Sequence, residues 1–219
     1  MKLHIVTACF GINKVNKIVL PVQKEFFDIT MSSYDDTNFY SRENSLNSRT
    51  KSKIPKMLEW LKIDADYYVW LDHNFTIISD NFAKTIIKQL NEKDLCLFKH
   101  PWNKNIAQEI MSIEKEIAKN NTYHISRYKG EPIRDQLHNY LNEGFIDDNL
   151  FSLGFFIYSK NLIKNRNYNL LTDWFFHNCY WSIQDQISLP YLLKKHKIDF
   201  SVFDYENIYN NELVKYNGY

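Results

Sequence analysis

The sequence predicts an α/β domain whose sheet is mostly parallel. Short apolar runs alternate with longer amphipathic segments of helical spacing as far as residue 98. The run at residues 67–71, Tyr-Tyr-Val-Trp-Leu, is wholly apolar, which is typical of a strand that is buried on both faces. The 219 residues can bury a sizeable core but are few for two domains. We therefore expect one domain over residues 1–219.

Apolar spacing places the elements in the first half of the chain. Residues 48–61 are expected to form an amphipathic helix because Ile54, Met57 and Leu61 recur at spacings of three and four. The other elements expected here are strands at residues 3–8, 17–22, 25–31, 67–71 and 95–98, and a helix at residues 81–90.

The second half continues with helices and one further strand. Ile106, Ile110 and Ile113 fall on one face of a helix expected at residues 105–119, and residues 120–130 are expected to be a polar connection. Pro132 suits a first helical turn and Gly144 suits the position just after a helix end. The remaining expected elements are a strand at residues 151–158 and helices at residues 172–180 and 185–194.

Composition excludes several classes of function. Lys and Arg number 27 against 26 Asp and Glu, so no excess of cations is present to bind nucleic acid or an anionic membrane. The five glycines are too dispersed for a P-loop or a GxGxxG turn. No run approaches the ~20 apolar residues that span a bilayer. The three cysteines lack CxxC spacing and the first residues do not resemble a signal peptide, so we expect reduced core thiols in a cytoplasmic protein.

The most informative segment is Asp72-His73-Asn74, directly after the apolar run at residues 67–71. Ligands of open α/β sheets bind beyond the carboxyl ends of the strands. Asp72 and Asn74 would offer two oxygen ligands on one side of an extended turn, which suits Mn²⁺ or Mg²⁺. Such a cation would neutralise a nucleotide diphosphate, for which the chain has no glycine-rich loop. The alternative is that Asp72 only caps a turn.

This segment resembles the Asp-x-Asp motif of GT-A glycosyltransferases, with Asn74 in place of the second Asp. Further blocks, between about residues 47 and 189, resemble one GT-A-like family, first catalogued as a domain of unknown function in plant pollen and mucilage polysaccharide proteins, with bacterial and viral relatives. These blocks are Asn47-Ser48-Arg49 with Lys53 and Pro55; residues 97–101 with Asn105 and Glu109; Gln136, Tyr140 and Gly144 with residues 150–154; and residues 181–189 with Asp185, Gln186 and Ser188. Gln184 stands where that family usually has Arg.

The resemblance implies a GT-A fold, a Rossmann-like, mixed but mostly parallel sheet flanked by helices. It also implies a metal-assisted enzyme that moves a hexosyl or deoxyhexosyl group from a nucleotide diphosphate sugar to a glycan or another hydroxyl acceptor. Donor contacts are expected from Thr7, Ala8, Phe10, Arg49, Lys53, Asp72 and His100, metal ligands from Asp72 and Asn74, and acceptor contacts from Asp148, Trp181 and Gln186. No nucleic-acid partner and no membrane span are expected.

Asp185 is expected to be the general base of an inverting transfer, which needs a carboxylate within reach of the acceptor hydroxyl. Its alternative role is to cap the helix that begins there. Asp147 and Asp148 form a rival acidic pair before the strand expected at residue 151.

Other hypotheses stay open at this point. A catalytically silent carbohydrate-binding or assembly module could retain the fold, as the Asn74 and Gln184 departures allow. A sugar nucleotidyltransferase uses a related sheet but normally has a glycine-rich loop after the first strand, where this chain has only Gly11. Arg49 and Lys53 could instead lie on a solvated helix face, and His100 could be structural. Trp102, Trp174 and Trp181 could stack on sugars or belong to the core.

Overall fold

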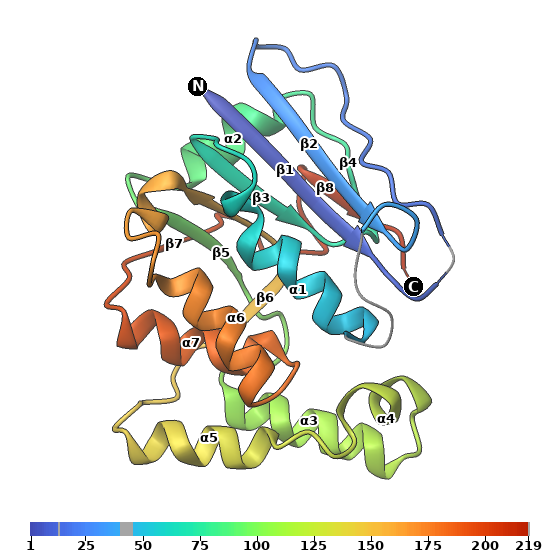
Figure 1. Ribbon diagram of the computed structural model, residues 1–219, viewed down its shortest axis with the longest axis vertical. Helices are drawn as coiled ribbons and strands as arrows, with labels where there is room; N and C mark the ends of the chain where they lie inside the picture. Colours follow the sequence, from blue (N-terminus) through green and yellow to red (C-terminus); the bar gives the residue numbers. More distant parts are fainter. Residues whose placement is uncertain (13, 40–45, 219) are drawn as a thin grey trace.

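A six-stranded sheet lies at the centre of the computed structural model, which describes residues 1–12, 14–39 and 46–218 (Figure 1). Its strands, in spatial order, are β2 (Asp28–Asp35), β1 (Lys2–Cys9), β3 (Tyr67–Leu71), β6 (Phe151–Ser159), β5 (Leu95–Lys99) and β7 (Ser201–Val202). The pairs β1–β2, β1–β3 and β5–β7 are parallel, whereas β6 is antiparallel to both of its neighbours. The predicted α/β class with a mixed, mostly parallel sheet flanked by helices is therefore confirmed.

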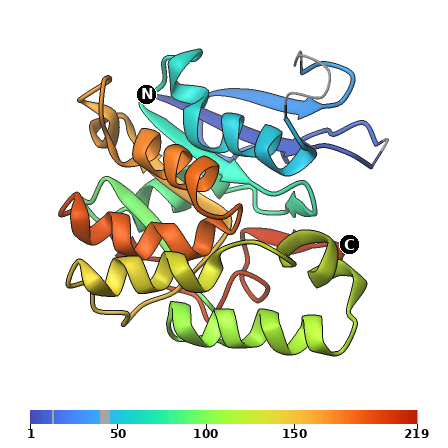
Figure 2. The same ribbon diagram turned by 60° about the horizontal axis from the view of Figure 1, so that its bottom comes forward.

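Helices cover the sheet and extend beyond one of its edges. They are α1 (Ser48–Leu58), α2 (Phe82–Gln89), α3 (Ile106–Ala118), α4 (Thr122–Tyr128), α5 (Ile133–Asn142), α6 (Leu170–Tyr180) and α7 (Asp185–Lys195), with 3₁₀ turns at Glu59–Leu61 and Lys160–Ile163. A separate antiparallel pair joins β4 (Phe75–Ile77) to β8 (Val214–Tyr216). Figures 1 and 2 show α3, α4 and α5 grouped beyond the edge toward which β1 and β3 point.

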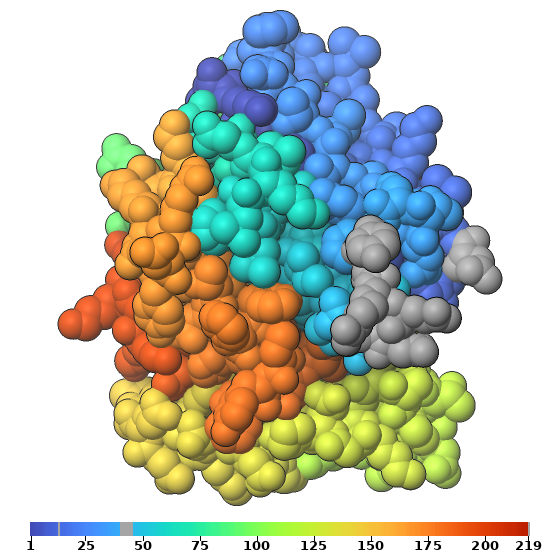
Figure 3. Space-filling view, viewed as in Figure 1, coloured from blue at the N-terminus to red at the C-terminus, as the bar shows by residue number. Residues whose placement is uncertain are grey.

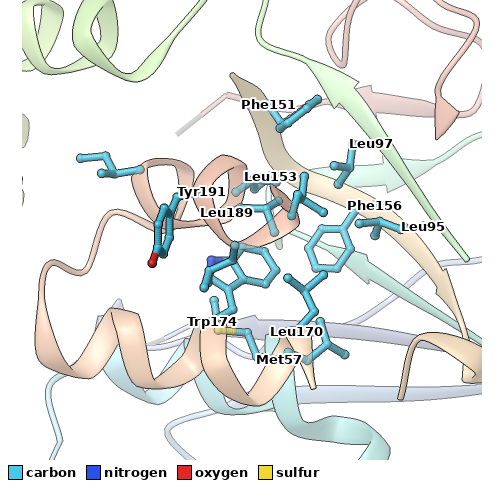
Figure 4. Packing of buried hydrophobic residues seen from close by; sticks show 14 of the residues in the cluster. Met57, Leu95, Leu97, Phe151, Leu153, Phe156, Leu170, Trp174, Leu189 and Tyr191 are labelled. Carbon is cyan, nitrogen blue, oxygen red and sulfur yellow. The ribbon is translucent and has the colours of Figure 1, made fainter. Parts of the chain in front are cut away.

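The alternation of side chains along the strands builds two apolar layers. On β3, Tyr68 and Trp70 face the layer that includes α1, α6 and α7, while Val69 and Leu71 face the layer that includes α2. Figure 4 shows the first layer, in which the fully buried Trp174 ring lies among aliphatic side chains from the helices and the sheet. In the space-filling view, α1 and α6 cover this face of the sheet (Figure 3). Because both faces are covered, the central strands β3, β5 and β6 are mostly apolar along their length, whereas the edge strand β2 is not.

Several expected elements differ from the structure. Residues 17–22 form no strand, and Val19 and Val22 are exposed, so their β-branched composition finds no partner strand. The strand expected at residues 25–31 begins instead at Asp28. The expected polar connection at residues 120–130 contains α4, whose first backbone N–H groups are capped by the Asn121 side chain.

Two further local expectations concern the end of the helix before Gly144 and the burial of the three cysteine thiols. The helix before Gly144 ends as expected, with a φ of 82° at that glycine. Cys9 and Cys96 are buried free thiols, whereas Cys179 is exposed, so the expectation that all three lie in the core was wrong for Cys179. Within the described ranges, no helix is both long enough and apolar enough to cross a membrane. The expectation of one domain stays a prediction.

Asp147 and Asp148 have different environments although they are adjacent. The two carboxylate oxygens of Asp147 accept the backbone N–H groups of Ile106 and Ala107, each at 2.8 Å, and so cap the start of α3. Asp148 is exposed and accepts a hydrogen bond from the Asn149 side chain. Asp147 therefore has a structural role in positioning α3.

We expect Asp147→Ala to lower the free energy of unfolding by about 1–2 kcal/mol, because two N–H groups of α3 lose their acceptor. The matched variant Asp148→Ala should change it by less than about 0.5 kcal/mol, as is usual for an exposed side chain. Urea unfolding of both variants tests this. Equal stability of the two would contradict the capping role.

Candidate active site at the carboxyl edge of the sheet

A pocket of about 380 Å³ lies at the carboxyl ends of the parallel strands. β1 and β3 are neighbours, but the chain continues from β1 to β2 on one side and from β3 toward β5 on the other. This divergence is the topological switch point at which open α/β sheets bind ligands. The lining residues from the sheet are Ala8, Cys9 and Phe10 at the end of β1, Trp70 and Asp72–Asn74 at the end of β3, His100 after β5, and Ser152–Gly154 near the start of β6.

A buried ion cluster joins α1 to α7 in this pocket. One carboxylate oxygen of Asp185, Oδ2, lies 2.7 Å from Lys53 Nζ and 2.7 Å from Lys56 Nζ. The three residues are 5%, 7% and 6% exposed, respectively. Lys53 and Lys56 are three residues apart in α1, which puts both ammonium groups on one face of the helix. Two cations and one anion leave this cluster with a net positive charge that is shielded from water.

Burial and pairing shift the pKa values in the cluster in a consistent way. Burial alone would raise the pKa of the Asp185 carboxyl, but Lys53 and Lys56 outweigh it and hold this pKa well below its usual range. Burial lowers the pKa of Lys53 to about 8, although Asp185 opposes the shift. Lys56 also lies over the rings of Trp70 and Phe156, 5.3 and 5.8 Å from their centroids. The cluster thus favours a further anion.

Oxygen atoms suited to a hard cation line the same pocket. Asp72 Oδ1 accepts the indole N–H of Trp70 at 2.7 Å. The other oxygen, Oδ2, would lie 3.2 Å from a Cβ atom at Gly154, so the glycine keeps this close approach open. Asn74 is 7% exposed, and its buried amide oxygen has no hydrogen-bond partner among the residues that the structure describes. A carboxylate and an orphaned amide oxygen fit Mn²⁺ or Mg²⁺.

These two residues would supply only part of a coordination shell. In the part of the chain that the structure describes, no group of three or more His, Cys, Asp or Glu residues could hold a metal ion. A cation at Asp72 and Asn74 would therefore take its other ligands from water or from a bound phosphate.

His100 and Glu109 form a third polar group at the pocket. His100 Nδ1 accepts the backbone N–H of Asn103 at 2.9 Å, and its Nε2 lies 3.7 Å from Glu109 Oε2. Burial lowers the pKa of His100, and Glu109 opposes this shift. Because Nδ1 accepts a hydrogen bond, the proton of the neutral ring would lie on Nε2. Gln184 donates to Glu109 Oε1 at 3.1 Å. His100 therefore has at least a structural role in the turn after β5.

Helix α4 closes another side of the pocket. Arg49 Nη1 donates to the backbone carbonyl of Arg127 at 2.9 Å, and its guanidinium lies 4.9 Å from the centroid of the Tyr128 ring. Arg49 is thus held by α4 rather than on a solvated helix face. Residues 120–130 were expected to be a polar connection, so the contribution of α4 to this side of the pocket was not predicted.

The pocket gathers nine of the expected site residues: Ala8, Phe10, Arg49, Lys53, Asp72, Asn74, His100, Asp185 and Gln186. Thr7, Asp148 and Trp181 are not among its lining residues. The Thr7 hydroxyl faces Asn16, Asp148 borders an apolar groove with Phe145 and Phe200, and Trp181 follows the end of α6. Their expected contacts with donor or acceptor stay predictions that this pocket does not support.

The lining residues that the sequence-based set of site residues lacked include Lys56, Glu109, Tyr128 and Gly154. The spacing of Lys53 and Lys56 could have revealed the first, since residues three apart share a helix face. The other three depend on tertiary packing.

Comparisons with known proteins give similar folds and no family. No protein-family model and no curated protein matches the chain. Mouse xyloside xylosyltransferase 1, in its apo form, is similar with a TM-score of 0.47 and 7% identity, over 93% of this chain and 86% of that one. A197 from STIV is similar with a TM-score of 0.41 and 12% identity, over 93% of this chain and 82% of that one. The bifunctional glycosyltransferase WbbM, in its apo form, is similar with a TM-score of 0.45 and 11% identity, over 89% of this chain but 38% of that one. Similarity of this degree assigns no activity.

We expect Asp185→Asn to lower the free energy of unfolding by about 3–5 kcal/mol at pH 7, because it leaves two buried ammonium groups without their anion. The folded pKa of Asp185 lies below the unfolded value. The difference between wild type and variant is therefore fully present above pH ~4 and shrinks as the pH falls toward the folded pKa.

The matched control is Asp199→Asn, which removes a carboxylate that pairs with Lys93 but is 75% exposed. It should cost less than about 1 kcal/mol. Chemical unfolding at several pH values measures both variants. If Asp185→Asn were as stable as Asp199→Asn, the two lysines would not depend on Asp185.

Proposed function

We propose that the protein is a metal-assisted glycosyltransferase that uses a nucleotide diphosphate sugar as donor. One observation carries the proposal: a buried, net positive Lys53–Asp185–Lys56 cluster and the cation-type oxygens of Asp72 and Asn74 line the same pocket. The phosphate groups of a diphosphate would pair with the positive cluster, and a divalent cation bound to the diphosphate would bind the oxygens of Asp72 and Asn74. The position at the switch point of the sheet and the sequence blocks that resemble a GT-A-like family support the same class.

The proposed reaction breaks the bond between the anomeric carbon and the diphosphate oxygen. A new bond forms from the acceptor oxygen to that carbon, and the acceptor hydroxyl loses its proton to a base. Lys53 and Lys56 would hold the diphosphate as negative charge develops on its departing oxygen. Mn²⁺ or Mg²⁺, bound by Asp72 and Asn74, would supply further positive charge for this leaving group.

Asp185 stays the proposed base, with a change in how it would act. While it accepts hydrogen bonds from both lysines, its lowered pKa makes it a weak proton acceptor. Phosphate oxygens that draw the ammonium groups away would raise this pKa. We propose that Asp185 positions the lysines before the donor binds and becomes more basic afterwards.

A catalytically silent carbohydrate-binding module is the second candidate, favoured by the weak basicity of the paired Asp185. Incubation with nucleotide diphosphate sugars and Mn²⁺ separates the two. Slow release of free nucleoside diphosphate supports the transferase, whereas no release from any donor that binds supports the module.

Binding of a nucleoside diphosphate and Mn²⁺ should be coupled, because two protein ligands cannot complete the shell of the metal. We expect each to raise the affinity for the other by roughly 5- to 150-fold, the usual range for coupled sites. Calorimetry with the diphosphate that stabilises the protein most in a thermal-shift screen measures the coupling.

Asp72→Ala should abolish this coupling. The control Asp80→Ala removes a surface carboxylate that pairs with Lys24 outside the pocket, and it should leave the coupling unchanged. Equal diphosphate affinity with and without Mn²⁺ in the wild type would rule out the proposed metal site.

Diphosphate binding should also take up a proton near pH 8. The pKa of Lys53 is about 8 in the free protein, and a bound anion raises it. The affinity should therefore fall as the pH rises above 8. Calorimetry in two buffers of different ionisation enthalpy counts the protons.

Lys53→Met should remove the proton uptake, while Lys51→Met, on the same helix but outside the pocket lining, should retain it. A wild-type affinity that stays constant from pH 7 to 9.5, with no proton uptake, would show that Lys53 does not bind the diphosphate.

A further inference from the structure

Trp102 is exposed but held in a defined place at the pocket. Its exposed fraction is 72%, and it lines the pocket beside His100. The backbone N–H groups of Trp102 and Asn103 donate to His100 Nδ1 at 3.4 and 2.9 Å, and Asn103 Nδ2 donates to Glu109 Oε2 at 2.7 Å. The turn that carries the indole is therefore fixed by buried groups.

One face of the Trp102 ring is already covered. It stacks on Tyr209 with centroids 5.6 Å apart and an interplanar angle of 22°. Tyr209 in turn stacks on Phe75 at 6.3 Å and 22°, and Phe75 directly follows Asn74. The three rings form an aromatic column from the Asp72–Asn74 turn to the rim of the pocket. The His100 ring also meets the indole edge-on, with centroids 5.7 Å apart and an interplanar angle of 77°, yet 72% of Trp102 is exposed, so most of the indole surface is accessible.

We infer that this exposed indole surface binds a sugar ring of the acceptor, so that the acceptor is a carbohydrate. The inference rests on the proposed function and names the substrate class for the second half of the site. A pyranose ring presents a face of C–H groups, which packs flat on an aromatic ring while its hydroxyls stay free for hydrogen bonds. An ordered, solvent-facing tryptophan at a pocket supplies such a platform at little cost in conformational entropy.

The surroundings of the platform favour a carbohydrate over a lipid or an apolar peptide. His100, Glu109 and Gln186 line the pocket with groups that can meet hydroxyls. A lipid chain would need a longer apolar groove, and the apolar groove near Phe145 and Phe200 has a lining distinct from that of this pocket. Trp102 thus replaces Trp181 as the tryptophan proposed to contact the acceptor.

Saturation-transfer difference NMR tests the inference with methyl glycosides of glucose, galactose, mannose, xylose, fucose and N-acetylglucosamine. Each is measured alone and with Mg²⁺ plus the nucleoside diphosphate that binds best. We expect at least one glycoside to receive saturation on its ring C–H protons. Trp102→Ala should weaken its binding by about tenfold, within the range for one aromatic contact.

Trp102→Phe, which keeps a smaller ring, should restore part of the affinity. Tyr180→Ala is the matched control, since Tyr180 is an exposed aromatic residue that is not among the pocket-lining residues. Melting temperatures of all variants establish that they are folded, and diphosphate affinity should not change in Trp102→Ala.

The outcomes separate the inference from the proposed function. If a diphosphate binds but no glycoside does, or if Trp102→Ala binds glycosides as well as the wild type, the carbohydrate platform is refuted and the donor site stands. If glycosides bind through Trp102 but no diphosphate binds, the platform is supported and the transferase proposal fails.

Discussion

Two lysines of α1 share one carboxylate oxygen at the start of α7, and the candidate site is built around this buried contact. It links two segments that are 132 positions apart in the sequence. Trp174 of α6 donates its indole N–H to the Asp185 carbonyl at 3.1 Å, so a third helix fixes the same point. A buried cluster with net positive charge is unfavourable by itself. An anion bound in the pocket would balance this positive charge, so the cluster suits an anion-binding site.

The sheet places oxygen atoms that suit a cation in the same pocket as the positive cluster. Asp72 directly follows β3 and lines the same pocket as the cluster. Gly154 lies near Asp72 in the neighbouring antiparallel strand β6, and a side chain at this position would crowd Asp72 and Phe75. The direction of β6 therefore matters to the site, because it brings the beginning of one strand next to the ends of the others. The oxygens of Asp72 and Asn74 and the ammonium groups of Lys53 and Lys56 thus belong to residues that line one cavity, which is the basis for proposing a metal–diphosphate ligand.

The sequence predicted the parts of this arrangement that depend on local pattern. Apolar period and length revealed β1, β3, α1 and α3, and the rule that strand ends gather ligands placed Asp72 near Ala8 and Phe10. Thr7 is not among the residues that line this pocket, and its side chain points to the face of β1 opposite to that of Ala8, since neighbouring side chains of a strand alternate. Lys56 was overlooked because a lysine on a helix is usually solvated. The direction of β6 and the packing of α4 on Arg49 depend on tertiary contacts, which no local pattern encodes.

A crystal structure of the protein with pyrophosphate and Mn²⁺ would test the central claim most directly. The expected result is a diphosphate whose oxygens contact Lys53 Nζ or Lys56 Nζ, together with an anomalous manganese peak at Asp72. A diphosphate bound away from α1, or manganese bound away from the Asp72–Asn74 turn, would contradict it.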